Sequence, residues 1–101
     1  MNKVILMGRL TRDPEVQNGS VKCTRYTLAV AKNKDAADFF SCVAFDKNAD
    51  FAEKYLHKGT KILIDGRLSI NSWADKDGKP HKDYQIIVDS HHFCESAKAS
   101  N

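Results

Sequence analysis

The segment DFFSCVAFD, residues 38–46, has the alternation of a β-strand that is buried on one face only. Side chains alternate between the two faces of a strand, so Phe39 and Phe45 share one face, while Phe40, Cys42 and Ala44 share the other. We expect the second set to line a core. The segment therefore predicts a strand that packs on one side and presents two phenylalanine rings on the other.

Four more strands and one helix are predicted around this segment. Residues 49–58 carry apolar side chains at helical spacing, between Asn48, which can cap a helix N-terminus, and a glycine. Residues 11–20 contain Asp-Pro and Asn-Gly pairs, which form turns. The predicted order is strand, strand, strand, helix, strand, strand, at residues 3–10, 21–32, 38–46, 49–58, 60–74 and 83–93.

This order is typical of one all-β architecture. Five strands with one short helix between the third and the fourth form an OB-fold, a five-stranded antiparallel Greek-key barrel, which leaves no open sheet edge. The helix would close one end of the barrel through Phe51, Tyr55 and Leu56, and Gly66 would mark a bulge. The Asp-Gly pair at 77–78 predicts a hairpin turn. The pattern alone leaves open a five-stranded sheet with the helix laid across one face.

The composition is that of one small domain. The chain has 101 residues, of which 42% are hydrophobic and 29% charged. No apolar run approaches the roughly 18 residues that span a bilayer, and the first apolar stretch, which ends before Arg9, is too short for a signal peptide. These features predict a cytoplasmic protein with no membrane partner. The net charge of +3 is uneven, because residues 1–34 hold seven Lys or Arg against two Asp or Glu.

No metal site, cofactor site or catalytic motif is predicted. The cysteines Cys23, Cys42 and Cys94 have no paired spacing, which argues against disulfides and against a zinc site, and we expect the first two in the core. His92 and Cys94 can share a strand face, but they offer two ligands where zinc needs three or four. The chain has no phosphate-binding glycine loop and no nucleophile motif, so we expect no enzyme activity.

Aromatic and basic residues instead predict nucleic-acid binding. Trp73, the only tryptophan, shares a strand face with Arg67 and other mostly polar residues, so it is expected to be exposed like Phe39 and Phe45. Exposed rings stack unpaired bases, while nearby cations neutralise phosphates. The candidate DNA-binding residues are Phe39, Phe45, Trp73, Lys3, Arg9, Lys34, Lys47, Lys58 and Arg67. For each of them a surface or packing role is the alternative.

Several longer stretches resemble a known family. MNKVILMGRLTRDPE at the amino terminus, YTLAVAKN, DFFSCVAFDKNADFAEKYLHKG and ILIDGRLSINSWADKDGK occur in the order and at the spacing of the bacterial and phage single-stranded DNA-binding protein family. The likeness extends to about residue 93. It implies an OB-fold that assembles as a homotetramer and wraps single-stranded DNA without sequence preference or catalysis. By resemblance, the base-stacking positions of the family are Phe39, Phe45 and Trp73, its basic positions are Lys3, Lys47 and Lys58, and Phe40 lies near a subunit interface.

This chain departs from the family pattern at three places. A short KNKDAAD loop leaves Lys34 near a position where many relatives have another aromatic residue. Asp46 stands where a glycine is usual, which places a negative charge near the expected DNA track. The chain ends CESAKASN, without a long tail and acidic tip, so recruitment of protein partners through such a tail is not expected. We assign residues 1–94 to the OB domain and 95–101 to a short disordered extension.

The resulting expectation is a passive binder of single-stranded DNA. It would protect unpaired strands and remove secondary structure during DNA replication, recombination and repair, in the cytoplasm at the nucleoid. Melting would follow from mass action, because the protein binds only the open strand. The alternative is an OB-fold protein-interaction subunit of a replication-restart complex, which would use the same barrel mainly to hold other proteins.

Overall fold

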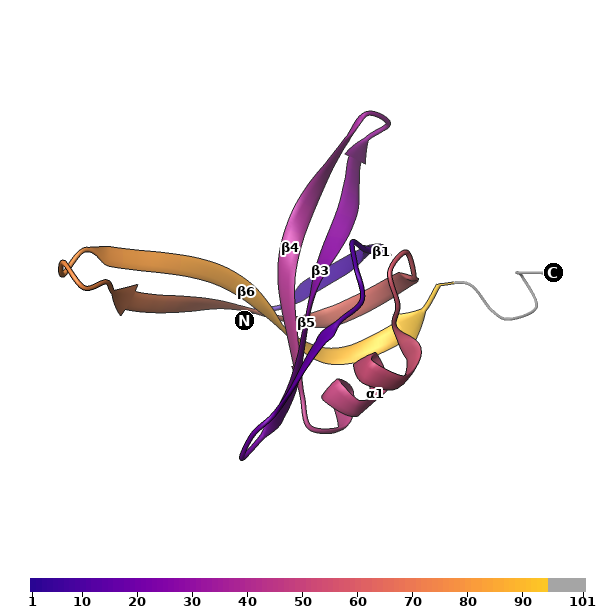
Figure 1. Cartoon of the computed structure of the whole chain (residues 1–101). Coiled ribbons are helices and arrows are strands. Elements are labelled where there is room, and N and C mark those ends of the chain that lie inside the picture. The colour runs from indigo at the N-terminus through magenta and orange to yellow at the C-terminus, as the bar shows by residue number, and fades with distance from the viewer. Residues whose placement is uncertain (95–101) are drawn as a thin grey trace.

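A closed β-barrel forms the body of the protein (Figure 1). The structure is a computed structural model that describes residues 1–94, and the extension expected at 95–101 lies outside the described residues. The elements within the described part are β1 (Val4–Leu10), β2 (Glu15–Asn18), β3 (Lys22–Asn33), β4 (Ala36–Phe45), α1 (Lys47–Tyr55), β5 (Lys61–Ala74) and β6 (Pro80–Phe93).

The strand order is β1-β5-β6-β4-β3-β2, and β1 also pairs with β3, which closes five of the strands into a barrel. The closing pairs are Arg9 with Ala29 and Leu10 with Leu28. All pairings are antiparallel except the one between β4 and β6, which is parallel. The predicted OB-fold is confirmed, and the closure excludes the open sheet that the sequence pattern left possible.

The predicted alternation in the second and third strands of the barrel is also confirmed. Tyr26 and Leu28 of β3 and Cys42 and Ala44 of β4 point into the core, where each is at most 5% exposed. Cys23 is buried as well. Fully burying one large aliphatic side chain stabilises the fold by roughly 1.5–3 kcal/mol, so this inward set, with Ile62 and Ile64 of β5, holds the barrel together.

One strand was not predicted. Residues 15–18 form β2, which pairs with β3 from Glu15 opposite Arg25 to Asn18 opposite Lys22. The two turn-forming pairs predicted in 11–20 are therefore separated by this short strand. A strand this short contains too few alternating positions to produce a period of two, and its pairing with β3 is what defines it. The expected turn after Asn18 leads directly into β3.

Helix α1 closes one end of the barrel, and the side chains that it buries match the prediction in part. Ala49, Ala52 and Leu56 are fully buried there, because positions three and seven residues apart share one helix stripe. Phe51 packs at the margin of the core. The prediction is wrong for Tyr55, which is 45% exposed and contacts the ring of Phe51 beside it.

The predicted cap of this helix is also wrong. Helix α1 begins at Lys47, and the residue before it, Asp46, makes no side-chain cap hydrogen bond. The side-chain amide of Asn48 instead donates to the backbone oxygens of Val88, at 3.3 Å, and Asp89, at 3.0 Å. Asn48 therefore ties the first turn of the helix to β6.

Two hairpins extend beyond the barrel and diverge from it (Figure 1). We call them the β3–β4 arm, whose tip contains Lys34, and the β5–β6 arm, whose tip is the turn at 75–79. The predicted bulge is present at Gly66, where a Cβ atom would lie 2.1 Å from the backbone oxygen of Ile87. Among the described residues, no helix is long and apolar enough to cross a membrane.

Candidate nucleic-acid interface

One continuous outer face runs across β3, β4, β6 and β5. Paired residues of neighbouring strands point to the same side of a sheet, so this side of β4 continues into β3 through Arg25 and into β6 through Ile87, both opposite Val43. Val43 itself is 1% exposed, so its neighbours cover the face at that point. In β5, Arg67 lies opposite Ile87 and Trp73 opposite His81. The face therefore carries Phe39, Phe45, Arg67 and Trp73, which come from distant parts of the sequence.

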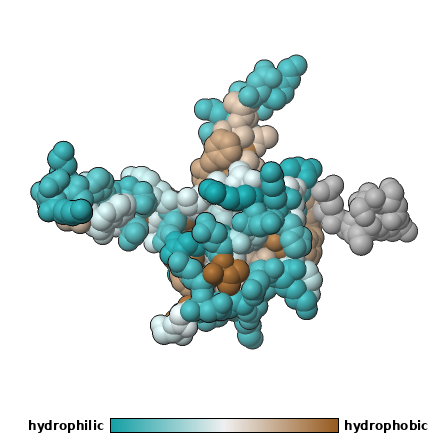
Figure 2. Space-filling view, in the orientation of Figure 1, coloured by the Kyte–Doolittle hydropathy of each residue, from teal (hydrophilic) through white to brown (hydrophobic). Residues whose placement is uncertain are grey.

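The three predicted stacking rings are all accessible to solvent. Phe39 is 66% exposed, Trp73 44% and Phe45 38%. Phe39 lies on the β3–β4 arm and Phe45 at the barrel end of the same strand, six residues away, which corresponds to about 20 Å along a strand. Figure 2 shows apolar side chains along the β3–β4 arm below a hydrophilic tip. The rings are thus placed as platforms on the surface and not as parts of the core.

Trp73 is held by neighbours at the outer end of the β5–β6 arm. The imidazole of His81 stacks on its indole, with ring centroids 5.3 Å apart and an interplanar angle of 20°. His81 Nε2 lies 2.8 Å from Oδ2 of Asp75, whose other oxygen accepts the backbone N–H groups of Asp77 and Lys79. The hydrogen bond with His81, followed by the one from Lys79, lowers the pKa of the Asp75 carboxyl. The turn is thereby linked to the orientation of the indole.

A shallow hollow of about 400 Å³ gathers three of the predicted site residues. It lies where β4 ends and α1 begins, and Phe45, Lys47 and Arg67 line it together with Asp46 and Asp89. We call it the lower hollow. Arg67 donates to Asp89 Oδ1 at 3.2 Å, an exposed ion pair that a phosphate could replace at little cost. The hollow combines a ring with two cations, which suits a nucleotide.

A second hollow of about 260 Å³ lies in the fork between the two arms. We call it the fork hollow, and it is lined by Arg25, Ser41, Asn71, Asp83, Tyr84 and Gln85. Ser41 is two residues from Phe39 on β4, and Asn71 is two residues from Trp73 on β5. The fork hollow therefore sits between two of the exposed rings.

The remaining basic candidates are spread more widely. Lys34 lies at the tip of the β3–β4 arm, and Lys3 precedes β1, where its Nζ is 3.1 Å from Asp65 Oδ1. Arg9 donates to the backbone oxygen of Gly59 at 3.0 Å. Arg9 and Lys58 lie at the α1–β5 loop, away from the aromatic face at the other end of β5. The structure brings Lys47 and Arg67 to the aromatic face, and it does not bring Arg9 and Lys58 there.

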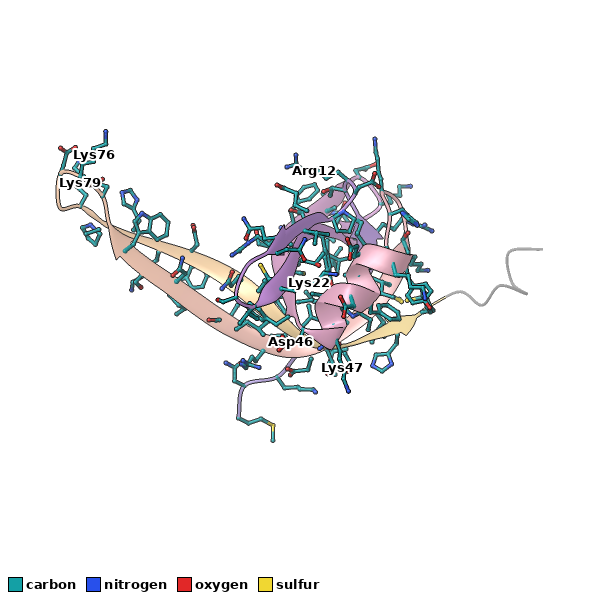
Figure 3. All side chains as sticks on the ribbon, turned by 60° about the horizontal axis from the view of Figure 1, so that its bottom comes forward. Arg12, Lys22, Asp46, Lys47, Lys76 and Lys79 are labelled. Carbon is teal, nitrogen blue, oxygen red and sulfur yellow. The ribbon has the colours of Figure 1, made fainter. Side chains whose placement is uncertain are left out.

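Acidic partners bind two of the lysines. Figure 3 labels Lys22, which lies beside α1. Lys22 donates to Asp50, at 2.6 Å, and to Glu53 of α1, and these hydrogen bonds raise its pKa. Lys3 forms an ion pair with the carboxylate of Asp65. Hydrogen bonds from Ser90, His92 and Lys3 hold the pKa of the Asp65 carboxyl well below its usual range. Lys22 is thus neutralised by two carboxylates, whereas Lys3 shares Asp65 with Ser90 and His92 and its side chain is 51% exposed, so a phosphate can still reach it.

Sequence reasoning missed several residues of this face. Arg25 and Asp83 line the fork hollow, and Lys76 and Lys79 lie at the tip of the β5–β6 arm (Figure 3). A usable signal existed for Arg25, because it alternates with the core residues Tyr26 and Leu28 and so must face outward. Asp83 could be placed only once the β5–β6 register was known.

Asp46 has an unusual backbone conformation. Its φ of 53° and ψ of −119° make it the only residue other than glycine with a positive φ in the described chain. Glycine adopts such angles without steric cost, whereas a Cβ atom makes them strained. The position lines the lower hollow, directly before Lys47 (Figure 3).

Comparison with known proteins identifies similar chains. A model of the single-strand binding protein family matches residues 1–94. A single-stranded DNA-binding protein of Fusobacterium nucleatum is 44% identical, over 99% of this chain and 71% of its own length. Proteins of the same name from Clostridium perfringens and Malacoplasma penetrans are 38% and 40% identical, over 95% and 89% of this chain and 67% and 50% of their own lengths.

Proposed function

Because this chain belongs to the single-strand binding protein family, we propose that it binds single-stranded DNA, protects unpaired strands and removes secondary structure during DNA replication, recombination and repair. The observation that carries the proposal at residue level is the common outer face of Phe39, Phe45 and Trp73, with Lys47 and Arg67 beside it. A single strand would follow this face from the lower hollow past the fork hollow to the arms.

Stacking and charge neutralisation would supply the affinity. Stacking a base on an aromatic side chain is worth about 1–3 kcal/mol, and it tolerates every base because every base has a π-face. Lys3, Lys34, Lys47 and Arg67 would add phosphate contacts whose strength falls as salt rises. We place Arg9 and Lys58 outside this main track, as a second positive group that a longer, wrapped strand could reach.

Removal of hairpins would need no energy source. A protein that binds only the open strand stabilises that strand by about 2.7 kcal/mol at a free concentration one hundred times its Kd. When several protein molecules bind along one strand, their contributions to the stability of the open strand would add up. The proposed activity is therefore binding alone, with no catalytic step, and we place it in the cytoplasm at the nucleoid.

We further propose that the chain forms a homo-oligomer, a homotetramer as the family resemblance implies. The outer face of β1 supports this, because Ile5 and Met7 are 62% and 48% exposed there. Within the described residues, the Val4–Gly8 part of β1 pairs only with β5, so its other edge is open to a further strand. Replacing Ile5 with Lys should shift the mass measured by light scattering toward smaller species.

The proposed function can be tested with the single tryptophan. Titration with a thymine oligonucleotide should quench Trp73 emission, and the affinity should fall steeply as salt is raised, whereas duplex DNA should compete poorly. A weak, salt-insensitive response would refute DNA binding and favour the protein-interaction subunit instead. The measurement should be repeated with Trp73→Phe by anisotropy of a labelled oligonucleotide, since this variant keeps a ring but removes the reporter.

A further inference from the structure

The fork hollow contains polar side chains that the fold does not use. Arg25, Asn71, Asp83 and Gln85 make no side-chain hydrogen bond or ion pair with any other described residue. Three of the four are exposed and Gln85 is half-buried. A few convergent polar groups with unused hydrogen-bonding capacity are typical of a ligand site.

The size and surroundings of the hollow fit one nucleobase. Its volume of about 260 Å³ lies just below the range of about 300–1,000 Å³ that holds larger ligands. Phe39 lies beyond Ser41 on one arm, and Trp73 lies beyond Asn71 on the other. A strand whose bases stack on these two rings must pass the hollow between them.

The two charged groups of the hollow come from different strands and from different levels of the sheet. Arg25 is on β3 and Asp83 on β6, and both strands neighbour β4 in the sheet. Arg25 is level with Ile87 of β6 through Val43, so Asp83 lies four residues further along β6, a step of about 13 Å in addition to the spacing of the strands. Because both side chains line the same hollow and the arginine side chain is long, one purine can receive hydrogen bonds from Arg25 and donate to Asp83.

We propose that the fork hollow is a guanine-preferring base subsite, in which Asp83 accepts from N1–H and N2–H of the base while Arg25 donates to O6 and N7. Guanine is the base that offers two adjacent donors to a carboxylate and two adjacent acceptors to a guanidinium. Cytosine and adenine offer a carboxylate only the donors of one amino group, and thymine only one N–H. The inference rests on the proposed function and adds a modest base preference to binding that is otherwise independent of sequence.

The charge of Asp83 supports a base contact over a phosphate contact. A carboxylate on a surface that binds DNA repels phosphates, so it weakens binding unless it receives hydrogen bonds from the nucleic acid. Base edges are the part of DNA that provides such donors. Arg25, which lines the same hollow, offers a planar fork of donors that Lys could not reproduce.

The test compares short thymine oligonucleotides that differ at one central base. Unlabelled oligonucleotides with dT, dG, dC or deoxyinosine at that position displace a labelled all-thymine strand from the full chain. We expect dG to compete about 3- to 10-fold better than dT. This factor is at the low end of the discrimination that a bidentate contact to a base provides, because the hollow is open to water. Inosine lacks the N2 amino group, so it should lose most of the gain although its ring stacks in the same way.

Variants locate the effect. Asp83→Asn should abolish the preference for dG while dT is still bound, and Arg25→Lys should reduce it at an unchanged salt dependence. Asp38→Asn is the matched control, because it removes the same charge from the neighbouring β3–β4 arm outside the hollow. Equal competition by dG and inosine, or an unchanged preference in Asp83→Asn, would overturn the inference and leave the proposed function intact. Failure of every oligonucleotide to compete would overturn both.

Discussion

Replacing Asp46 with Gly should make the protein more stable and also bind DNA more tightly. With φ at 53° and ψ at −119°, the Asp46 backbone has a conformation that costs a residue with a Cβ atom about 1–3 kcal/mol. Glycine removes this strain but loses about 0.5–1 kcal/mol to the greater freedom of the unfolded chain. We expect the free energy of unfolding to rise by about 1 kcal/mol. The backbone bonds of Asp46 to Lys22 and Asp50 do not involve its side chain and should remain.

The same substitution removes a negative charge from the lower hollow. Two unit charges about 10 Å apart in water interact by about 0.4 kcal/mol, so each nearby phosphate should contribute roughly a twofold gain in affinity. Asp46→Asn separates the two effects, because it removes the charge and keeps the Cβ atom. Its affinity should therefore rise as in Asp46→Gly, while its stability should stay within about 0.5 kcal/mol of the original chain.

Two assays measure these quantities independently. Urea unfolding followed by circular dichroism gives the free energy of unfolding, and anisotropy of a labelled thymine oligonucleotide at about 0.1 M salt gives the affinity. If Asp46→Gly is no more stable than Asp46→Asn, the backbone at residue 46 is not strained. If neither variant binds more tightly than the original chain, the Asp46 carboxylate does not repel the bound strand.

Three further predictions concern stacking, phosphate contacts and pH. Phe39→Ala and Phe39→Leu should both weaken binding by about 1–3 kcal/mol in the anisotropy assay, and full affinity in the leucine variant would exclude stacking. Lys47→Ala should reduce the slope of log affinity against log salt by about 0.7, whereas the slope should not change in the control Lys54→Ala, which is exposed on the same helix. Burial lowers the pKa of His91 to about 4 from its ordinary value of 6.5, so the unfolded chain binds a proton before the folded one does as pH falls. The free energy of unfolding should therefore drop between pH 6.5 and 4 by on the order of 1–2 kcal/mol after allowance for partial exposure, and His91→Gln should show a smaller drop.

The fold could be predicted because most of its signals are local. In β3 and β4, alternation places Tyr26 and Cys42 on the inner face and Arg25 and Phe39 on the outer face. This assignment does not require knowledge of which strands pair, because the period of two depends only on backbone geometry. The bulge at Gly66 could be predicted in the same local way, because a glycine inside a strand often marks a bulge. The strand β2 and the helix cap gave weaker signals, because four residues carry little periodicity and because Asp46 does not cap with its side chain.

The composition of the site was only partly predictable. The outward direction of Phe39, Phe45 and Trp73 follows from strand parity, and the structure confirms that all three are exposed. The fork hollow depends on the parallel contact of β4 with β6, which joins segments more than forty residues apart. No local pattern places Arg25 near Asp83, so this part of the site required the strand order.

The stack of His81 on Trp73 limits how a strand can travel over the β5–β6 arm. One side of the indole is already covered, so a nucleotide can approach only from the other side and cannot be sandwiched. Trp73 would then end a run of stacked bases, and the sugar–phosphate chain would have to turn away at that point. The β5–β6 arm would thus define one end of the DNA segment that a single protein molecule binds.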